Sequence, residues 1–306
     1  MNVALITHPD CLLHEMGPGH PESPKRLVAI KEQLIASGLD EELQHFEAPV
    51  VTREQLHRVH DQQYVQSLFD QAPDQGLVWL DPDTAMNKHT LDAALRAAGA
   101  VVLAVELVMT GRVSRAFCNV RPPGHHAERA RAMGFCFFNN IAIGAAHALE
   151  QWGLERVAIV DFDVHHGNGT EDIFQDEKRV LYCSTFQHPY YPYSCLQSAR
   201  KTMVKVPLEA GAGSQPFQQA VEAHWLPSLD EFKPQLVFIS AGFDAHADDP
   251  LAEIKLTESD YTWVTKKIDA VSQRYASNHI ISVLEGGYAL TALGRSAVAH
   301  IDALFS

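Results

Sequence analysis

The 306-residue chain is predicted to fold as a three-layer α/β/α sandwich around a mostly parallel central sheet. Short β-branched runs alternate along it with longer stretches of helical periodicity. The short runs are continuously apolar, which is typical of strands buried on both faces of a parallel sheet. No repeat, low-complexity tract or linker divides the chain, so we expect a single domain over residues 1–306.

These patterns predict six strands and seven helices. The expected strands occupy residues 3–7, 115–120, 156–161, 180–185, 236–240 and 280–284. The expected helices occupy residues 23–37, 62–71, 91–110, 140–152, 215–230, 258–276 and 290–304. Because strands and helices alternate, the helices should cover both faces of the sheet.

Composition narrows the class of protein. The five cysteines (Cys11, Cys118, Cys136, Cys183 and Cys195) are odd in number and include no CxxC pair, which fits neither a disulfide framework nor a thiolate zinc site. The N-terminus lacks the pattern of a signal peptide, and no apolar run is long enough to span a bilayer. We therefore expect a cytoplasmic protein with no membrane partner.

The formal net charge is −14, which argues against a nucleic acid partner. An acidic surface favours solubility and also favours the approach of cationic substrates. A homo-oligomer is compatible with the sequence.

Chemically unusual segments follow four of the predicted strands. They are Arg121-Pro-Pro-Gly-His-His126, Asp161-Phe-Asp-Val-His-His166, Ala241-Gly-Phe-Asp244 and Glu285-Gly-Gly-Tyr288. Ligands of open parallel sheets bind beyond the carboxyl ends of the strands. We therefore expect these segments to form one site.

The second segment predicts a metal centre. In an extended chain Asp161, Asp163 and His165 share one face, and three titratable groups at a buried strand end need a cation or hydrogen bonds. Asp244 is the expected third ligand beside Asp163 and His165, with His246, Asp248 and Asp249 as rivals further along its loop. Three protein ligands leave an open position, as in catalytic sites, and this ligand set accepts Zn²⁺ or Fe²⁺.

The first segment predicts proton transfer. Pro122, Pro123 and Gly124 direct the chain so that His125 and His126 are presented together, and two imidazoles beside a metal-activated water suit acid–base work. Asp161 is expected to orient one of them. Tyr288 follows the last strand, where its phenol would stabilise a developing oxyanion. Such a donor is needed because two carboxylate ligands weaken the cation as a Lewis acid.

These motifs, together with Gly134-Phe-Cys-Phe-Phe-Asn139, resemble the histone deacetylase/acetylpolyamine amidohydrolase superfamily. The resemblance runs from Gly19-His-Pro-Glu-Ser-Pro-Lys-Arg26 through Leu80-Asp-Pro-Asp-Thr84 to Tyr288. It implies an arginase-like α/β/α fold and the hydrolysis of an acylated amine. Asn168 is the residue of the class II branch at its position, so the chain looks like a class II-like, bacterial-type member.

The resemblance also implies roles for single residues. Asp163, His165 and Asp244 match the zinc ligands, His126 stands in the general-base place, His125 is the partner held by Asp161, and Tyr288 polarises the carbonyl.

The substrate tunnel would be lined by Gly134, Phe135, an aromatic at Tyr190 or Tyr191, and Leu251 at the rim. Structural K⁺ would bind Asp161, Asp163, His165 and Ser184 at an inner site, and the carbonyls of Phe174 and Val180 at an outer one. Arg26 falls beside an internal product channel.

Residues at the rim of the expected substrate tunnel bear on the choice of substrate. The segment 187–199 differs from the eukaryotic rim loop, and Leu251 stands where the polyamine-selective branch carries a glutamate. An apolar residue there favours acyl-lysine or a less charged amide, and an acetylpolyamine or another small amide is the alternative substrate. Two rival readings stay open: a binding module that recognises acyl-amines without hydrolysis, and a two-metal ureohydrolase, which needs further bridging carboxylates and a second histidine ligand.

Overall fold

The computed structural model describes residues 2–193 and 200–306, so Cys195 and part of the segment 187–199 lie outside the described residues. The main sheet has the strand order β2-β1-β5-β10-β9-β6-β7-β8, and all of its neighbouring strands are parallel. Its strands are β1 (Val3–Thr7), β2 (Gln44–Glu47), β5 (Arg115–Cys118), β6 (Val157–Asp161), β7 (Val180–Gln187), β8 (Met203–Leu208), β9 (Leu236–Ala241) and β10 (Ile280–Leu284). The predicted parallel sheet is confirmed. A small antiparallel pair joins β3 (Val78–Trp79) to β4 (Ala85–Met86).

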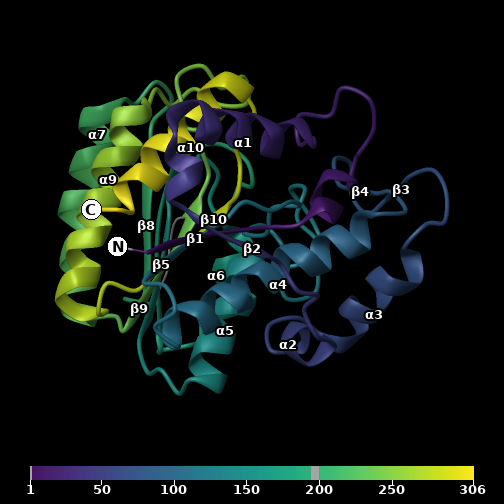
Figure 1. Ribbon diagram of the computed structural model, residues 1–306, viewed down its shortest axis with the longest axis horizontal. Helices are drawn as coiled ribbons and strands as arrows, with labels where there is room; N and C mark the ends of the chain where they lie inside the picture. Colours follow the sequence, from purple (N-terminus) through teal and green to yellow (C-terminus); the bar gives the residue numbers. More distant parts are fainter. Residues whose placement is uncertain (1, 194–199) are drawn as a thin grey trace.

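Helices cover both faces of the sheet (Figure 1). On one face α1 (Lys25–Ser37) packs on α10 (Leu290–Ala303), which packs on α9 (Glu258–Tyr275). On the other face α4 (Thr90–Met109) packs on α5 (Asn140–Gln151). The shorter helices are α2 (Arg53–His57), α3 (Gln62–Gln71), α6 (Asn168–Phe174), α7 (Ser214–Ala220) and α8 (Leu226–Phe232), with 3₁₀ turns η1 (Pro9–Leu12) and η2 (Leu39–Glu42). The three-layer α/β/α prediction is confirmed.

Four strands were missing from the prediction: β2 and β8, which are the two edge strands of the main sheet, and the two-residue strands β3 and β4. In β2 the residues alternate between half-buried and exposed, and in β8 only the two end residues are buried. An edge strand is covered less completely than a central one, so it lacks the continuous apolar run used to find the others. Pro207 in β8 is tolerated because an edge strand has unpaired backbone groups on one side.

The predicted helix 215–230 is interrupted. It consists of α7, a π-helical turn η3 (Val221–Trp225) and α8. Pro227 lies at the start of α8, where a proline lacks the backbone N–H and its ring crowds the carbonyl four residues earlier. A wider turn before the proline relieves that crowding. The short helices α2 and α6 were not predicted, because one or two turns carry too little periodicity.

The four described cysteines (Cys11, Cys118, Cys136 and Cys183) are buried free thiols. Among the described residues, no helix combines the length and the apolar character needed to cross a membrane.

His300 is a buried histidine of the helical layer, and it predicts a pH-dependent stability. Its Nδ1 lies 2.6 Å from the Thr265 hydroxyl and its Nε2 lies 2.8 Å from the Ser282 hydroxyl. Burial lowers its pKa from 6.5 to about 3. Below pH 6.5 the His300 imidazole is therefore protonated in the unfolded state but neutral in the folded state. The free energy of unfolding consequently falls as the pH drops towards 3.

We expect His300→Gln to remove this dependence, which amounts to about 1.4 kcal/mol per pH unit between the two pKa values. Denaturant unfolding of both proteins at pH 7 and pH 5 measures the slope. The exposed His45 provides the control, since His45→Gln should keep the wild-type slope. Equal slopes for His300→Gln and wild type would contradict the assignment.

Candidate active site

A cavity of about 280 Å³ opens where several strands of the sheet end. Its lining comes from segments that follow β5, β6, β7, β9 and β10, joined by the loop that carries Asp83. The lining residues are Asp83, Pro123, His125, His126, Gly134, Phe135, His165, Tyr190, Tyr191, Tyr193, Leu251, Gly286 and Tyr288. The four segments that the sequence singled out therefore converge, as the rule for parallel sheets predicts.

His165, which lines this cavity, forms a cluster with the buried Asp163 and Asp244, and the candidate ligand atoms of the three residues all lie within 4.8 Å of one another. The Nδ1 of His165 is 3.1 Å from Asp163 Oδ1 and 3.2 Å from Asp244 Oδ2. Backbone groups hold the carboxylates: the N–H of Gly286 donates to Asp163 Oδ2 at 2.8 Å, and the N–H of Val164 donates to Asp244 Oδ1 at 2.9 Å.

Two glycines allow the carboxylates to pack this closely. A Cβ at position 286 would lie 2.0 Å from Asp244 Oδ2, and a Cβ at position 242 would lie 2.0 Å from Asp163 Oδ2. Any side chain at either position would displace a carboxylate. Positions 242 and 286 therefore need glycine, because any Cβ there would collide with a carboxylate of the cluster.

The cluster fits a divalent cation. Asp244 Oδ2 is buried and has no hydrogen-bond partner among the described residues, although it faces Asp163 and His165. Burial and the neighbouring charge of Asp163 raise the pKa of Asp244 to about 6. Two carboxylates crowded together in this way are stabilised by a shared cation, and one imidazole with two carboxylates is a ligand set used by catalytic metal sites.

None of the three rival ligands belongs to the cluster. The Nδ1 of His246 accepts the N–H of Asp248, and its Nε2 lies 3.5 Å from Glu258. Asp248 is exposed and pairs with Arg295. Asp249 binds backbone N–H groups on the Tyr288 segment.

His125 is held by the carboxylate that the sequence proposed for it. Its Nδ1 lies 3.0 Å from Asp161 Oδ2, and its Nε2 lies 3.8 Å from Asp163. Burial disfavours a charged imidazole, but the carboxylates of Asp163 and Asp161 outweigh it and hold the pKa of His125 well above its ordinary value. This imidazole is suited to carry a proton.

His126 has the opposite character. Burial and the charge on His125 hold its pKa well below the ordinary value. Its Nδ1 lies 2.8 Å from Asn168 Oδ1, and the Asn168 amide donates to Glu128 at 2.7 Å. Because the Glu128 carboxylate only accepts, the Asn168 oxygen must face His126, so the proton of the neutral ring is on Nδ1. Nε2 is left free to accept a proton.

Tyr288 lines the same cavity as the tandem histidines. Its ring makes an edge contact with Phe135, and the guanidinium of Arg26 lies 5.0 Å from its centre. Burial holds the pKa of its phenol well above the ordinary value, so the hydroxyl keeps its proton and is available as a donor.

The five residues predicted for the tunnel all line the cavity: Gly134, Phe135, Tyr190, Tyr191 and Leu251. Tyr190 stacks on His165, and Tyr191 makes edge contacts with His126 and His165. The Tyr190 hydroxyl donates to the Leu251 carbonyl. The sequence left Tyr190 and Tyr191 as alternatives, and the structure brings both to the site.

The residues proposed for potassium lie in two groups. Asp161 and Ser184 are register partners in β6 and β7, next to Asp163 and His165. Phe174 ends α6 and Val180 begins β7. Arg26 is buried beneath Tyr288, where it donates to the backbone carbonyls of Gly287 and Glu285 and pairs with Glu22. Potassium binding and the product channel stay predictions.

The sequence reasoning missed two buried groups of the site. Glu285 accepts the N–H groups of Gly124 and His125 at 2.7 and 3.1 Å, and so holds the tandem-histidine loop. The Tyr182 hydroxyl donates to Asp161 Oδ2 at 2.8 Å. Glu285 carried the same signal as Asp161, an acid directly after a buried strand. Tyr182 carried none, because it is one aromatic within an apolar strand.

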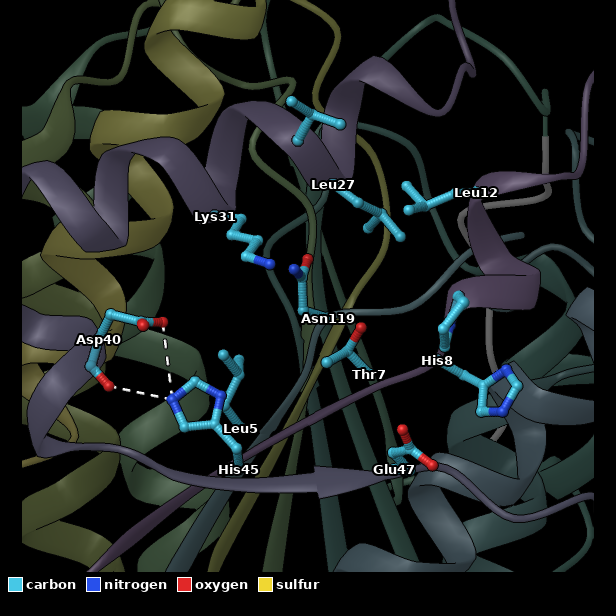
Figure 2. Close-up of a pocket in the computed structure, with 12 residues that line it drawn as sticks. Leu5, Thr7, His8, Leu12, Leu27, Lys31, Asp40, His45, Glu47 and Asn119 are labelled. Atoms are coloured by element: carbon cyan, nitrogen blue, oxygen red, sulfur yellow. Dashed lines mark hydrogen bonds and ion pairs between the residues drawn. The ribbon is translucent and has the colours of Figure 1, made fainter.

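A second hollow, of about 260 Å³, lies between α1 and the carboxyl ends of β1 and β2 (Figure 2). Its polar lining includes Thr7, Lys31, His45 and Glu47, and none of its lining residues was predicted to be catalytic or metal-binding. The chemistry proposed from the sequence therefore gathers at the first cavity.

The fold and the cavity together fit a hydrolase of the α/β class with a candidate metal site at Asp163, His165 and Asp244. The model of the histone deacetylase domain matches residues 20–304. A "Probable deacetylase" of Archaeoglobus fulgidus is 36% identical over 301 residues, covering 95% of this chain and 82% of the relative. The "Polyamine deacetylase HDAC10" of Mus musculus is 34% identical and covers 99% of this chain but 48% of that longer protein. The solved structure entitled "Crystal Structure of HDA15 HD domain" matches with a TM-score of 0.93 at 34% identity, covering 99% of this chain and 88% of that one.

The chain belongs to the histone deacetylase family. Members of this family are hydrolytic deacetylases and are typically metal-dependent, so the chain is an enzyme and the reading as a non-hydrolytic binding module is set aside.

Proposed function

We propose that the enzyme is zinc-dependent and hydrolyses the amide bond of an acetylated amine, with acyl-lysine as the preferred substrate. The observation that carries the proposal is the convergence of the Asp163, His165 and Asp244 cluster, the two unlike imidazoles and the Tyr288 phenol on one cavity. An amide hydrolase needs a nucleophilic water, a base, a donor to the carbonyl oxygen and an acid for the leaving amine.

In the proposed mechanism Asp163, His165 and Asp244 would hold the cation, which would supply Lewis-acid chemistry and make water more acidic. The unprotonated Nε2 of His126 takes the proton of the attacking water, while Asn168 keeps the ring in the required tautomer. The Tyr288 hydroxyl donates to the carbonyl oxygen as negative charge develops there. A protonated histidine of the tandem pair then gives its proton to the departing amine.

The histidines are unequal for a reason that suits these roles. His125 is paired with Asp161, which favours its charged form. His126 has only the neutral amide of Asn168 on Nδ1 and lies beside the charged His125, which favours its neutral form. A base must start without its proton, so we assign that role to His126.

Leu251 and the aromatic walls of the cavity favour an acyl-lysine, whose apolar methylene chain would lie between them. An acetylated polyamine is the alternative substrate. It is supported by Asp83, which places a carboxyl group at the same cavity, and by the likeness to a relative named a polyamine deacetylase.

A substrate screen tests the proposal. Protein reconstituted with zinc should release acetate from a fluorogenic acetyl-lysine peptide faster than from an acetylated polyamine, a chelator should stop both reactions, and returned zinc should restore them. Faster turnover of the polyamine would reverse the substrate order. Two metal ions per chain in the active enzyme would instead favour the ureohydrolase reading.

A further inference from the structure

Asp249 is a buried carboxylate that belongs neither to the metal cluster nor to the proton-transfer machinery. Its Oδ2 accepts the backbone N–H of Tyr288 at 2.7 Å and that of Ala289 at 3.1 Å. Its Oδ1 accepts the backbone N–H of Leu251 at 3.0 Å. One side chain thus ties the loop after β9 to the turn after β10.

Both segments joined by Asp249 contribute to the cavity. The loop after β9 carries Asp244 of the candidate metal cluster and continues to Leu251 at the cavity wall. The turn after β10 contains Gly287, whose φ of +120° is readily adopted only by glycine, and then Tyr288. Because this permissive residue directly precedes Tyr288, the position of the phenol depends on the contacts that hold the backbone around it.

We propose that Asp249 is a positioning residue for Tyr288: by accepting the backbone N–H groups of Tyr288 and Ala289, it fixes the place of the phenol relative to the metal cluster. The inference rests on the proposed role of Tyr288 as the donor to the carbonyl oxygen. The ring contacts Phe135 and Arg26, and Arg26 also donates to the backbone carbonyls of Glu285 and Gly287, before Tyr288. Asp249 is the group that holds the backbone N–H groups of Tyr288 and Ala289 themselves.

A carboxylate is required for this task. It offers acceptor oxygens on both sides, whereas an asparagine would present its amide N–H groups to one of the backbone N–H groups that Asp249 now satisfies. The negative charge also lies next to the first residue of α10, where the N-terminal end of a helix favours an anion.

The test compares Asp249→Asn with the matched control Asp248→Asn. Asp248 is the neighbouring acid, but it is exposed on the surface and pairs with Arg295. In Asp249→Asn we expect kcat on the acetyl-lysine peptide to fall about 10- to 100-fold, because small displacements of a catalytic group carry losses of this size. The metal content and KM should stay at wild-type values, and Asp248→Asn should match wild type throughout.

A double-mutant cycle separates positioning from a general structural role. If Asp249 acts through the Tyr288 hydroxyl, Asp249→Asn should add little to the loss already caused by Tyr288→Phe. Independent, multiplicative losses would overturn the inference, as would an unchanged kcat in Asp249→Asn. Should that variant lose its metal or fold poorly, Asp249→Glu replaces it in the same cycle, because it keeps the acceptor charge.

The cycle also distinguishes the two hypotheses. If Tyr288→Phe is itself fully active, the proposed role of Tyr288 fails and the inference fails with it. If Tyr288→Phe is slow but the effect of Asp249→Asn multiplies with it, only the positioning role of Asp249 is wrong.

Discussion

Asp244→Ala is expected to remove the metal and to lower turnover by roughly 10³-fold or more. Asp244 supplies one of the three clustered ligands, and two ligands cannot hold the cation as tightly. Loss of the cation forfeits several kcal/mol of transition-state stabilisation, and each 1.36 kcal/mol corresponds to a factor of ten in rate. Metal analysis of the purified protein and steady-state assays on the acetyl-lysine peptide measure both effects.

Two companion variants make this result interpretable. Asp244→Asn keeps an oxygen for the backbone N–H of Val164, so it retains the local fold while removing the charge. Asp248→Ala changes an exposed acid four residues away, and its metal content should equal that of wild type. In a thermal unfolding assay, added zinc should raise the Tm of metal-free wild type but not that of Asp244→Asn. A full complement of metal in both Asp244 variants would refute the assignment.

Tyr288→Phe is expected to lower kcat by about 10²- to 10³-fold while leaving the metal in place. The substitution removes only the hydroxyl, and the ring contacts with Phe135 and Arg26 remain. Tyr288 is not among the clustered ligands, so metal content should not change. The loss should fall on kcat rather than KM, since the donor is needed most when charge develops on the carbonyl oxygen.

The matched control is Tyr275→Phe, which makes the same chemical change at the end of α9, away from the cavity. It should have wild-type kcat and metal content. Full activity of Tyr288→Phe on every substrate that wild type hydrolyses would show that Tyr288 does not donate to the carbonyl oxygen.

Much of the architecture could be predicted from local patterns. The central strands β1, β6, β9 and β10 are continuously apolar because both of their faces are covered, and the long helices carry clear periodicity. The edge strands β2 and β8 were not predicted, because most of their residues are only partly buried or exposed and form no continuous apolar run. The interruption between α7 and α8 was not predicted, because the helical periodicity continues through it. It depends on how the backbone accommodates Pro227.

The candidate site divides in the same way. Asp163, His165, Asp244 and the tandem histidines could be named from sequence, because acids and imidazoles directly after buried strands are rare without a function. The sequence favoured Asp244 as the acid of the loop after β9 that joins the cluster, but it kept Asp248 and Asp249 as rivals. Asp244 does so, whereas Asp249 turns to the Tyr288 segment because its carboxylate meets backbone donors there.

Residue chemistry and its order along the chain were thus enough to indicate the fold class, the family resemblance and the candidate ligands. The partners of each group were decided only by folding: Glu285 on the histidine loop, Asn168 on His126, and Asp249 on the Tyr288 turn. The physical reason is that hydrogen bonds and charge interactions act over a few ångströms, whereas Gly124 and Glu285, for example, are 161 residues apart in the chain.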